Sequence, residues 1–213
     1  MGESASLYHI TQKRILRTTL KLNSREEKVG GTAFNGSNRK ESLFDVIRRC
    51  QDGDTKAMEE IYSDYKSSLF NLTYRYTRSL SSAEDLLQDI FIKIFTRISK
   101  LRSPEAFNAW VYRTAINACI SSTRKSGRGK HIPLNEIDKP DKAEEDNIHI
   151  RLDMEKAVSI LPPKQKAVFL LHDVQGFTHG EIAQVMKWSE GTSKSQLFRA
   201  RMSIRGHLKD KRP

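Results

Sequence analysis

The sequence predicts an all-α protein of two small helical domains joined by a flexible linker. Apolar residues recur mainly at spacings of three and four, the period of a helix, rather than at the spacing of two typical of strands. Residues 127–150 are polar, carry a slight acidic excess and contain Gly and Pro without an apolar period, as linkers do. The chain therefore divides into an N-terminal extension (1–41), a first domain (42–126), the linker (127–150) and a second domain (151–213).

Composition indicates a polyanionic partner. The 213 residues include 37 Lys and Arg against 26 Asp and Glu, a net charge of +11, which favours nucleic acid first and an acidic membrane surface second. Two distant cysteines, Cys50 and Cys119, exclude a disulfide framework and fit a reducing cytoplasm. The longest apolar run, Ala167–Leu171, is far shorter than the roughly 18 residues of a membrane helix, and no secretion signal is apparent. We expect a cytoplasmic protein without membrane insertion.

Residues 1–41 show no sustained period and contain a basic segment before a stretch rich in Gly, Asn and Ser. We expect a flexible basic extension. It is either an arm that touches nucleic acid or a tail without a role, and we assign it no site.

Three helices are predicted in the first domain after a short helix at Leu43–Cys50. The first, Ala57–Leu72, follows Asp54 as its N-cap. The second begins with a capping box at Ser81–Glu84. It has two adjacent apolar ridges, formed by Leu86, Ile90, Ile94 and Ile98 and by Leu87, Phe91 and Phe95. We expect these two ridges to lie in the core of the first domain.

The opposite face of that second helix carries Asp85, Gln88, Asp89, Ile92 and Thr96. An outward Ile among acids and amides indicates a surface that a partner covers. Alternatively, Ile92 is one exposed apolar residue of the kind that folded proteins commonly carry.

The third helix is predicted at Glu105–Ser122, with Ser103 and Pro104 at its start. One side of it is polar and leads into the basic end that includes Lys125; the residues are Arg113, Asn117, Ser121 and Arg124. Such groups bind base edges or phosphates, and the nearby Tyr112 and Trp110 can stack on unpaired bases, so the stripe indicates single-stranded nucleic acid. A merely solvated face has the same spacing.

The second domain is predicted to end in a helix-turn-helix. Helices at Leu152–Leu161 and Lys164–Val174 precede a capping box, Thr178–Glu181, and the short helix Glu181–Met186. A turn at 187–189 leads into an amphipathic last helix, placed for insertion into the major groove of DNA. Its outward residues are Lys194, Ser195, Gln196, Phe198, Arg199, Arg201 and Arg205.

Nothing indicates an enzyme. The six histidines show no metal-ligand spacing, and His179 and Glu181 are explained by the capping box. There is no phosphate-binding glycine loop and no nucleophile elbow. We expect no catalytic residue, no metal and no cofactor.

Both domains resemble, in order, parts of the bacterial sigma factors, and in particular the compact extracytoplasmic-function (ECF) group. The N-terminal domain resembles sigma region 2, through the segments AMEEIYSDYKSSLFNLTYRYTRS, AEDLLQDIFIKIFTRI and FNAWVYRTAINACISSTRK. The C-terminal domain resembles region 4, through ILPPKQKAVFLLHDVQGFTHGEIAQVMKWSEGTSKSQLFRARMSIR. The short linker leaves no room for region 3, which the primary sigma factors carry between them.

The resemblance implies a role for each surface in transcription initiation. Asp85, Gln88, Asp89 and Ile92 match the family surface that docks on the clamp helices of the largest subunit of core RNA polymerase. The loop Leu101–Ala106 and the stripe with Arg113 and Asn117 match the part that captures unpaired bases of the minus-ten promoter element, and we add Arg124 and Lys125 to that DNA-binding set. The family's helix that reads the minus-thirty-five element matches Lys194, Ser195, Phe198 and Arg199. An anti-sigma factor is a further implied partner.

Some residues depart from the family pattern. Lys187 stands where many relatives have Gly, so a left-handed conformation is expected there at a cost of about 1 kcal/mol. Ser193 and Gln196 stand where relatives often have Val and a basic residue. The alternative function is a LuxR-type helix-turn-helix regulator that binds duplex DNA unaided, but that interpretation leaves the Asp85–Thr96 face and the Arg113 stripe unexplained.

Overall fold

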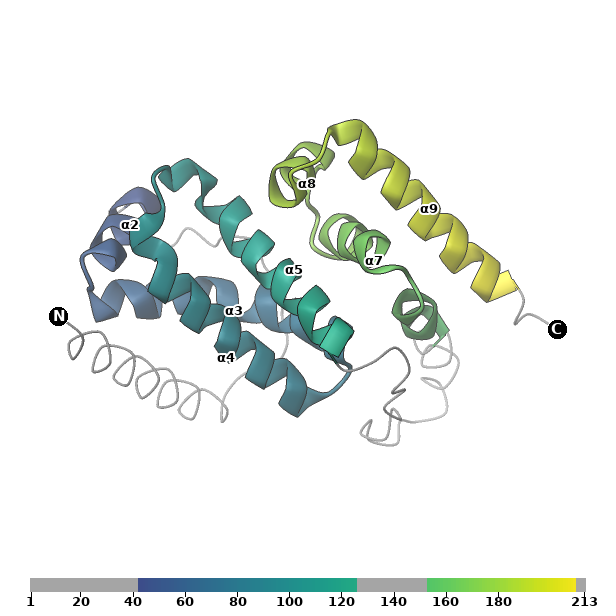
Figure 1. Cartoon of the computed structure of the whole chain (residues 1–213), viewed down its shortest axis with the longest axis horizontal. Helices are drawn as coiled ribbons and strands as arrows, with labels where there is room; N and C mark the ends of the chain where they lie inside the picture. The colour runs from purple at the N-terminus through teal and green to yellow at the C-terminus, as the bar shows by residue number, and fades with distance from the viewer. Residues whose placement is uncertain (1–41, 126–152, 210–213) are drawn as a thin grey trace, which may run out of the picture.

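The fold is all-α, as the sequence predicts (Figure 1). A computed structural model describes residues 42–125 and 153–209, and within these two ranges there is no strand. The predictions for the extension 1–41 and for the linker 127–150 lie outside the described residues, so the structure does not test them.

Four helices form the N-terminal domain: α2 (Leu43–Gln51), α3 (Thr55–Thr77), α4 (Leu80–Arg97) and α5 (Phe107–Lys125). Two short 3₁₀ turns, η1 (Ile98–Lys100) and η2 (Pro104–Ala106), connect α4 to α5. A capping box between Ser42 and Asp45 starts α2, and Asp54 caps α3 by accepting a hydrogen bond from the Lys56 amide, as expected for Asp54.

Two of the predicted helix starts are wrong. The N-cap of α4 is Ser79, which accepts from the Ser82 amide, and not the box at Ser81–Glu84. Arg78 adopts the left-handed conformation (φ 57°) directly after α3, which leaves Ser79 in position to cap α4. Ser103 does not cap a helix; its hydroxyl donates to the Glu105 carboxylate, and Pro104 opens a 3₁₀ turn before α5.

The predicted apolar ridges of α4 form the middle of the N-terminal core. All seven ridge residues are buried, and the rings of Tyr62 and Phe91 meet with centroids 4.6 Å apart. Helix α5 packs on both α3 and α4 and buries Phe107, Val111 and Cys119. This packing fixes the α5 face that carries Arg113 relative to α4.

The C-terminal domain consists of a short helix over residues 153–159, α7 (Pro163–Phe169), α8 (His179–Met186) and α9 (Glu190–Lys209). The last turns of the predicted Lys164–Val174 helix widen into a π-helical segment, η3 (Leu170–Val174). Gly176 follows with φ +76°, a conformation that favours glycine and ends the helix.

The two domains pack directly against each other, with α7 and α8 beside α5 and α9 on the far side of them (Figure 1). At the C-terminal end of α3, the Arg78 guanidinium donates to the Glu155 carbonyl (3.2 Å) and pairs with the Glu155 carboxylate. The Lys166 ammonium lies 4.7 Å from the Tyr76 ring centroid, and the Tyr76 hydroxyl donates to the Pro163 carbonyl (3.4 Å). A charged side chain is therefore buried where the domains meet.

Replacing Lys166 with Met should stabilise the protein at neutral pH. Lys166 is only 6% exposed, and burial, reinforced by the nearby Arg78 charge, lowers its pKa from 10.5 to about 8. Below pH 8 both folded and unfolded chains hold the proton, so the folded state bears the full cost of the buried charge. Between pH 8 and 10.5 the unfolded state binds more protons, and wild-type stability rises with pH.

We therefore expect Lys166→Met to raise the free energy of unfolding by about 2 kcal/mol at pH 7, allowing for the lost cation–π contact. This gain should shrink as the pH rises from 8 to 10.5. Urea unfolding of both proteins at pH 7 and at pH 10 measures it, and a gain that is absent or independent of pH would contradict it.

Candidate nucleic-acid and protein interfaces

A helix-turn-helix is formed by α8 and α9, with both of its predicted local features confirmed. Thr178 and Glu181 make the capping box: the Thr178 amide donates to the Glu181 carboxylate (2.8 Å), and the Glu181 amide donates to the Thr178 hydroxyl (3.3 Å). Lys187 ends α8 in the left-handed conformation (φ 56°), as its position in the turn predicts. The amides of Lys187 and Trp188 both donate to the Ala183 carbonyl.

The start of α9 is an exposed polar surface. Ser189 caps it by accepting from the Thr192 amide (3.2 Å). Of the residues predicted to contact DNA, Gln196 is half-buried, and the exposed ones are Lys194, Ser195, Phe198, Arg199 and Arg201. Phe198, at 66% exposure, projects an aromatic ring among basic groups. Such a surface can bond phosphates and base edges and contact thymine methyl groups.

Arg201 of α9 is already paired with a carboxylate. Its guanidinium donates to both carboxylate oxygens of Asp173, at 3.0 and 2.6 Å. Burial alone would raise the pKa of Asp173, but the hydrogen bonds from Arg201 and His172 and the charges of these two residues together lower it. Arg201 therefore ties α9 to the end of η3 besides carrying exposed charge.

A partly buried polar network, which the sequence pattern did not reveal, holds α9 against α8. His179 Nδ1 lies 2.9 Å from the Ser193 hydroxyl, which is fully buried. The His179 ring packs on the His172 ring at 4.7 Å, and His172 in turn bonds Asp173. Burial, together with the His172 and Lys194 charges, lowers the pKa of His179. His179 thus does more than start a helix, and the polar Ser193 in a position where relatives often have Val was the available signal.

On α5 the predicted stripe is divided. Asn117, Ser121 and Arg124 are exposed, and Lys125 ends the helix, but its side chain lies outside the described residues. Arg113 is engaged by the other domain: its Nε donates to the Val185 carbonyl (2.7 Å), and Nη2 donates to the Gln184 carbonyl. The stripe is therefore not one continuous free surface.

The expectation that Tyr112 can stack on a base is wrong for this conformation. Tyr112 is only 6% exposed, its hydroxyl donates to Ser68 (3.0 Å), and its ring meets Phe177 edge-on at 4.6 Å. Trp110 is half-buried and packs against Phe107. Sequence spacing placed these rings on the helix but could not show that a second domain covers one of them.

The Gln51 side chain supports the loop between α4 and α5. Gln51 Nε2 donates to the carbonyls of Ile98 (3.0 Å) and Leu101 (2.9 Å). This leaves Arg102, Ser103 and Glu105 exposed at the surface. Gln51 thus supports the start of the segment Leu101–Ala106, and the Ser103–Glu105 bond lies within the segment itself.

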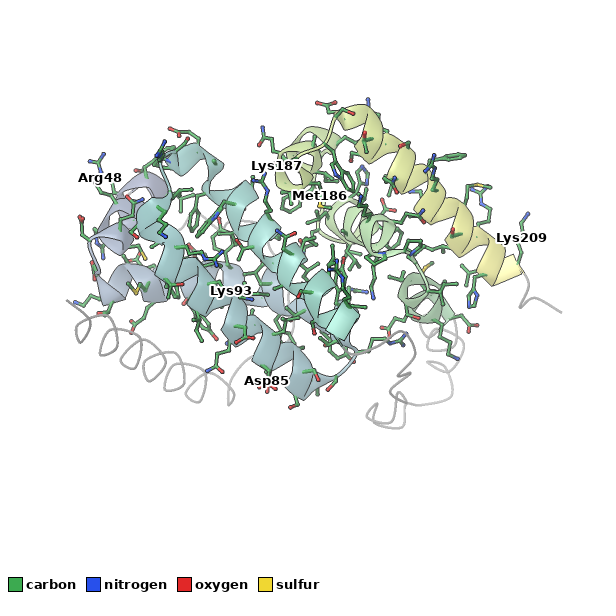
Figure 2. All side chains as sticks on the ribbon, viewed as in Figure 1. Arg48, Asp85, Lys93, Met186, Lys187 and Lys209 are labelled. Atoms are coloured by element: carbon green, nitrogen blue, oxygen red, sulfur yellow. The ribbon has the colours of Figure 1, made fainter. Side chains whose placement is uncertain are left out.

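The outer face of α4 is acidic and partly apolar. Asp85 and Asp89 are exposed and Gln88 is half-buried. Ile92 is not the fully outward residue that the helical spacing predicts, because it is partly buried against the core. Figure 2 shows Asp85 at an edge of the molecule remote from Lys187 and the helix-turn-helix. This face can bind a partner without contacting α9.

Within the described residues, no cluster of His, Cys, Asp and Glu could hold a metal ion. In the same part of the chain, no helix is long and apolar enough to cross a membrane.

Comparison with known families matches residues 61–129 to "Sigma-70 region 2" and residues 151–204 to "Sigma-70, region 4". RNA polymerase sigma-H factor of Pseudomonas aeruginosa is 27% identical over 175 residues, covering 75% of this chain and 90% of the relative. ECF RNA polymerase sigma-E factor of Haemophilus influenzae is 29% identical over 184 residues, covering 76% and 93%.

Solved structures share the fold. CnrH, in complex with the cytosolic domain of CnrY, aligns with a TM-score of 0.61 at 16% identity over 78% of this chain and 97% of that one. The sigma factor RpoE, in complex with the anti-sigma factor NepR from Bartonella quintana, aligns with a TM-score of 0.57 at 23% identity over 74% and 100%.

The buried bond between His179 and Ser193 should couple the two helices energetically. We expect Ser193→Ala and His179→Ala each to destabilise the protein by about 1 kcal/mol, because each removes the hydrogen bond and His179→Ala also deprives the buried Ser193 hydroxyl of its side-chain partner. The double variant should lose about 1 kcal/mol less than the sum. Urea unfolding of the four proteins measures the coupling, with the exposed Ser203→Ala as the control expected to change little. Strictly additive losses would contradict the coupling.

Proposed function

The chain belongs to the sigma-70 family and, within it, to the ECF group of RNA polymerase sigma factors, and we propose that it binds core RNA polymerase, directs it to specific promoters and assists their opening. The observation that carries this function is the match of regions 2 and 4, in that order, to the two helical domains. None of the relatives named above is a LuxR-type regulator.

The division of labour follows the domains. We assign polymerase docking and minus-ten recognition to residues 42–126, and minus-thirty-five recognition to residues 151–213, with 127–150 as the linker. The two family matches, 61–129 and 151–204, support these boundaries.

The first turns of α9 read the minus-thirty-five element. Lys194, Ser195 and Arg199 are exposed on one surface with the ring of Phe198, and Gln196 lies beside them. The capped start of α9 and the His179–Ser193 bond keep this surface in a fixed orientation. Side chains at the start of a recognition helix reach base edges while flanking Arg and Lys neutralise phosphates. Arg201 is placed for a phosphate contact in this arrangement.

The unpaired minus-ten strand is held by α5. The residues that hold it are Asn117, Arg113 and, at the basic end of the helix, Arg124 and Lys125. The exposed Asn117 amide can bond a base edge, and the Arg side chains can bond phosphates. The adjoining loop at Leu101–Ala106, supported by Gln51, offers exposed polar groups to an extruded base. Contacts available only to separated strands lower the free energy of the open complex relative to the closed one.

The α4 face with Asp85, Gln88, Asp89 and Ile92 docks on the clamp helices of the largest polymerase subunit. Its two carboxylates are exposed, and the partly buried Ile92 adds an apolar side chain one turn beyond Asp89. An anti-sigma factor is a second protein partner, since RpoE is seen bound to NepR.

The chain itself performs no chemistry in this function. The polymerase makes the phosphodiester bonds, while these residues supply recognition and part of the free energy of strand opening. The protein acts where the polymerase acts, in the cytoplasm.

Co-purification with bacterial core RNA polymerase, followed by run-off transcription from a genomic promoter library, tests the function. We expect a stable complex and new start sites that share one promoter motif. Tight binding to duplex DNA without any association with polymerase would overturn the proposal in favour of an unaided regulator.

Asp89→Lys should abolish assembly with core polymerase while leaving the fold intact, because Asp89 is exposed and the change reverses a charge on the docking face. Gel filtration with core enzyme measures assembly, and circular dichroism checks folding. Glu59→Lys, the same charge change at an exposed residue of α3, is the matched control. Normal assembly by Asp89→Lys would remove this face from the interface.

Arg199→Ala should weaken promoter affinity by about 1 to 3 kcal/mol if Arg199 contacts a base. Binding of the assembled holoenzyme to its promoter fragment, measured at fixed salt, tests this. Lys156→Ala, at an exposed position outside α9, serves as the control. Equal affinities for Arg199→Ala and wild type would exclude Arg199 from the recognition surface.

A further inference from the structure

Two histidine rings lie against each other next to the start of α9. His172, in the middle of η3, and His179, the first residue of α8, have ring centroids 4.7 Å apart and planes inclined by 32°. Both residues are only partly buried, and the His172 side chain retains 30% exposure. The pair is therefore a titratable cluster that solvent or a ligand can reach.

The Nδ1 atom of each ring already has a partner. His172 Nδ1 lies 2.7 Å from an Asp173 carboxylate oxygen, and His179 Nδ1 lies 2.9 Å from the Ser193 hydroxyl. A hydroxyl can donate to a neutral ring or accept from a charged one, so the bond to Ser193 persists when His179 is protonated. The fully buried Ser193 thus supports both forms of His179, which the Val that relatives often have there cannot do.

Positive groups surround the pair in the free protein. Burial is the largest cause that lowers the pKa of His179, and the charges of His172, Lys194 and Arg201 lower it further. Lys194 and Arg201 are both exposed on α9. Two side chains that the proposed function assigns to DNA therefore lie within electrostatic reach of the His179 ring.

The remaining charged groups around the pair act in the other direction or at a distance. Glu190, at the start of α9, raises the pKa of His179, but less than the cations and burial lower it. The Asp173 carboxylate is shared between His172 and Arg201, at 2.7 and 2.6 Å. From α5, Arg113 contacts the opposite end of α8, where its Nε donates to the Val185 carbonyl.

We propose, resting on the proposed function of α9, that the His172–His179 pair is a proton-linked contact to the backbone of duplex DNA. A phosphate held by Lys194 and Arg201 lies next to the pair, and the imidazoles gain protons in the complex. Binding of duplex DNA therefore takes up protons, and the affinity rises as the pH falls.

The charge of the phosphate determines the direction of this effect. It offsets the cations that oppose protonation of His179, and it accepts a charge-assisted hydrogen bond from an imidazolium. The pKa of the pair is thus higher in the complex, and by linkage binding tightens wherever the complex holds more protons than the free protein. The first helix of a helix-turn-helix crosses the DNA backbone, and the pair lies at the start of that helix, α8.

Folding has the opposite pH dependence. The pKa of His179 is lower in the folded protein than in the unfolded chain, so the unfolded state binds more protons as the pH falls through this range, and stability declines. Tighter DNA binding at lower pH therefore cannot result from a more stable protein.

Fluorescence anisotropy of the full chain with a labelled random-sequence duplex, at fixed ionic strength, measures the affinity at pH 5.5 and at pH 8. We expect about fivefold tighter binding by the wild type at the lower pH, since a rise of one pKa unit in the complex corresponds to at most about tenfold. His172→Gln combined with His179→Gln should reduce the difference to less than about twofold, because an amide can bond Ser193 but does not titrate.

His207→Gln is the matched control, because it makes the same change at a partly buried histidine about four turns beyond Ser193 on α9. It should keep the wild-type pH dependence. Lys166, with a pKa of about 8, is present in every variant, so its contribution cancels in the comparison. An undiminished pH dependence of the folded His172→Gln/His179→Gln variant would overturn the proposal. A wild-type protein that binds the duplex equally at both pH values, or at neither, would overturn it too.

Proton uptake is also measured directly. Isothermal titration calorimetry of the wild type with the same duplex at pH 6.5, in buffers of different ionisation enthalpy, gives the number of protons bound together with the DNA. We expect an uptake of about half a proton for the wild type and about none for His172→Gln/His179→Gln. No uptake, or a release of protons, by the wild type would contradict the proposal.

The two proposals fail separately. Proton-linked binding of the duplex without promoter-dependent transcription would refute the sigma function alone. Promoter-dependent transcription together with a duplex affinity that does not depend on the pair would refute the proton-linked contact alone.

Discussion

The arrangement of the two domains depends on how the C-terminal carbonyls of α8 are satisfied. Lys187 leaves the helix in the left-handed conformation, so its amide and that of Trp188 both turn back to the Ala183 carbonyl. The next two carbonyls, of Gln184 and Val185, then lack donors from their own helix. Arg113 of α5 supplies them. One strained turn residue in the second domain thus creates the acceptor that the first domain binds.

This contact orders the functional surfaces around it. With α8 held against α5, α9 lies on the outer side of the C-terminal domain, where its basic start is exposed. The His172–His179–Ser193 network and the Arg201–Asp173 pair hold α9 to α8 and η3. The acidic face of α4 stays free on another side of the molecule. Two of the three proposed surfaces are therefore available in this arrangement, and only that on α5 is partly covered.

Local chemistry accounts for most of what the sequence predicted correctly. The ridges of α4 are buried because seven large apolar residues at helical spacing form one continuous face, which is removed from water only by packing into the core. The Thr178–Glu181 box and the left-handed Lys187 depend only on neighbouring residues, so both could be predicted. The error at Ser81 arose because several hydroxyls precede α4 and the path of the preceding turn selects Ser79 among them. The error at Ser103 arose because its hydroxyl donates to the Glu105 carboxylate instead of accepting from a backbone amide.

By itself, the sequence determined the all-helical class, the two domains, the helix-turn-helix and the family, because periodicity, capping and motif order are local properties. It also placed the predicted binding residues on the correct helices. Only the tertiary structure decided which of them are free. Arg113 and Asn117 lie one turn apart on α5, yet the second domain binds one and leaves the other exposed. Contacts between Arg113 and a segment some 70 residues away depend on how the domains pack, which no local pattern encodes.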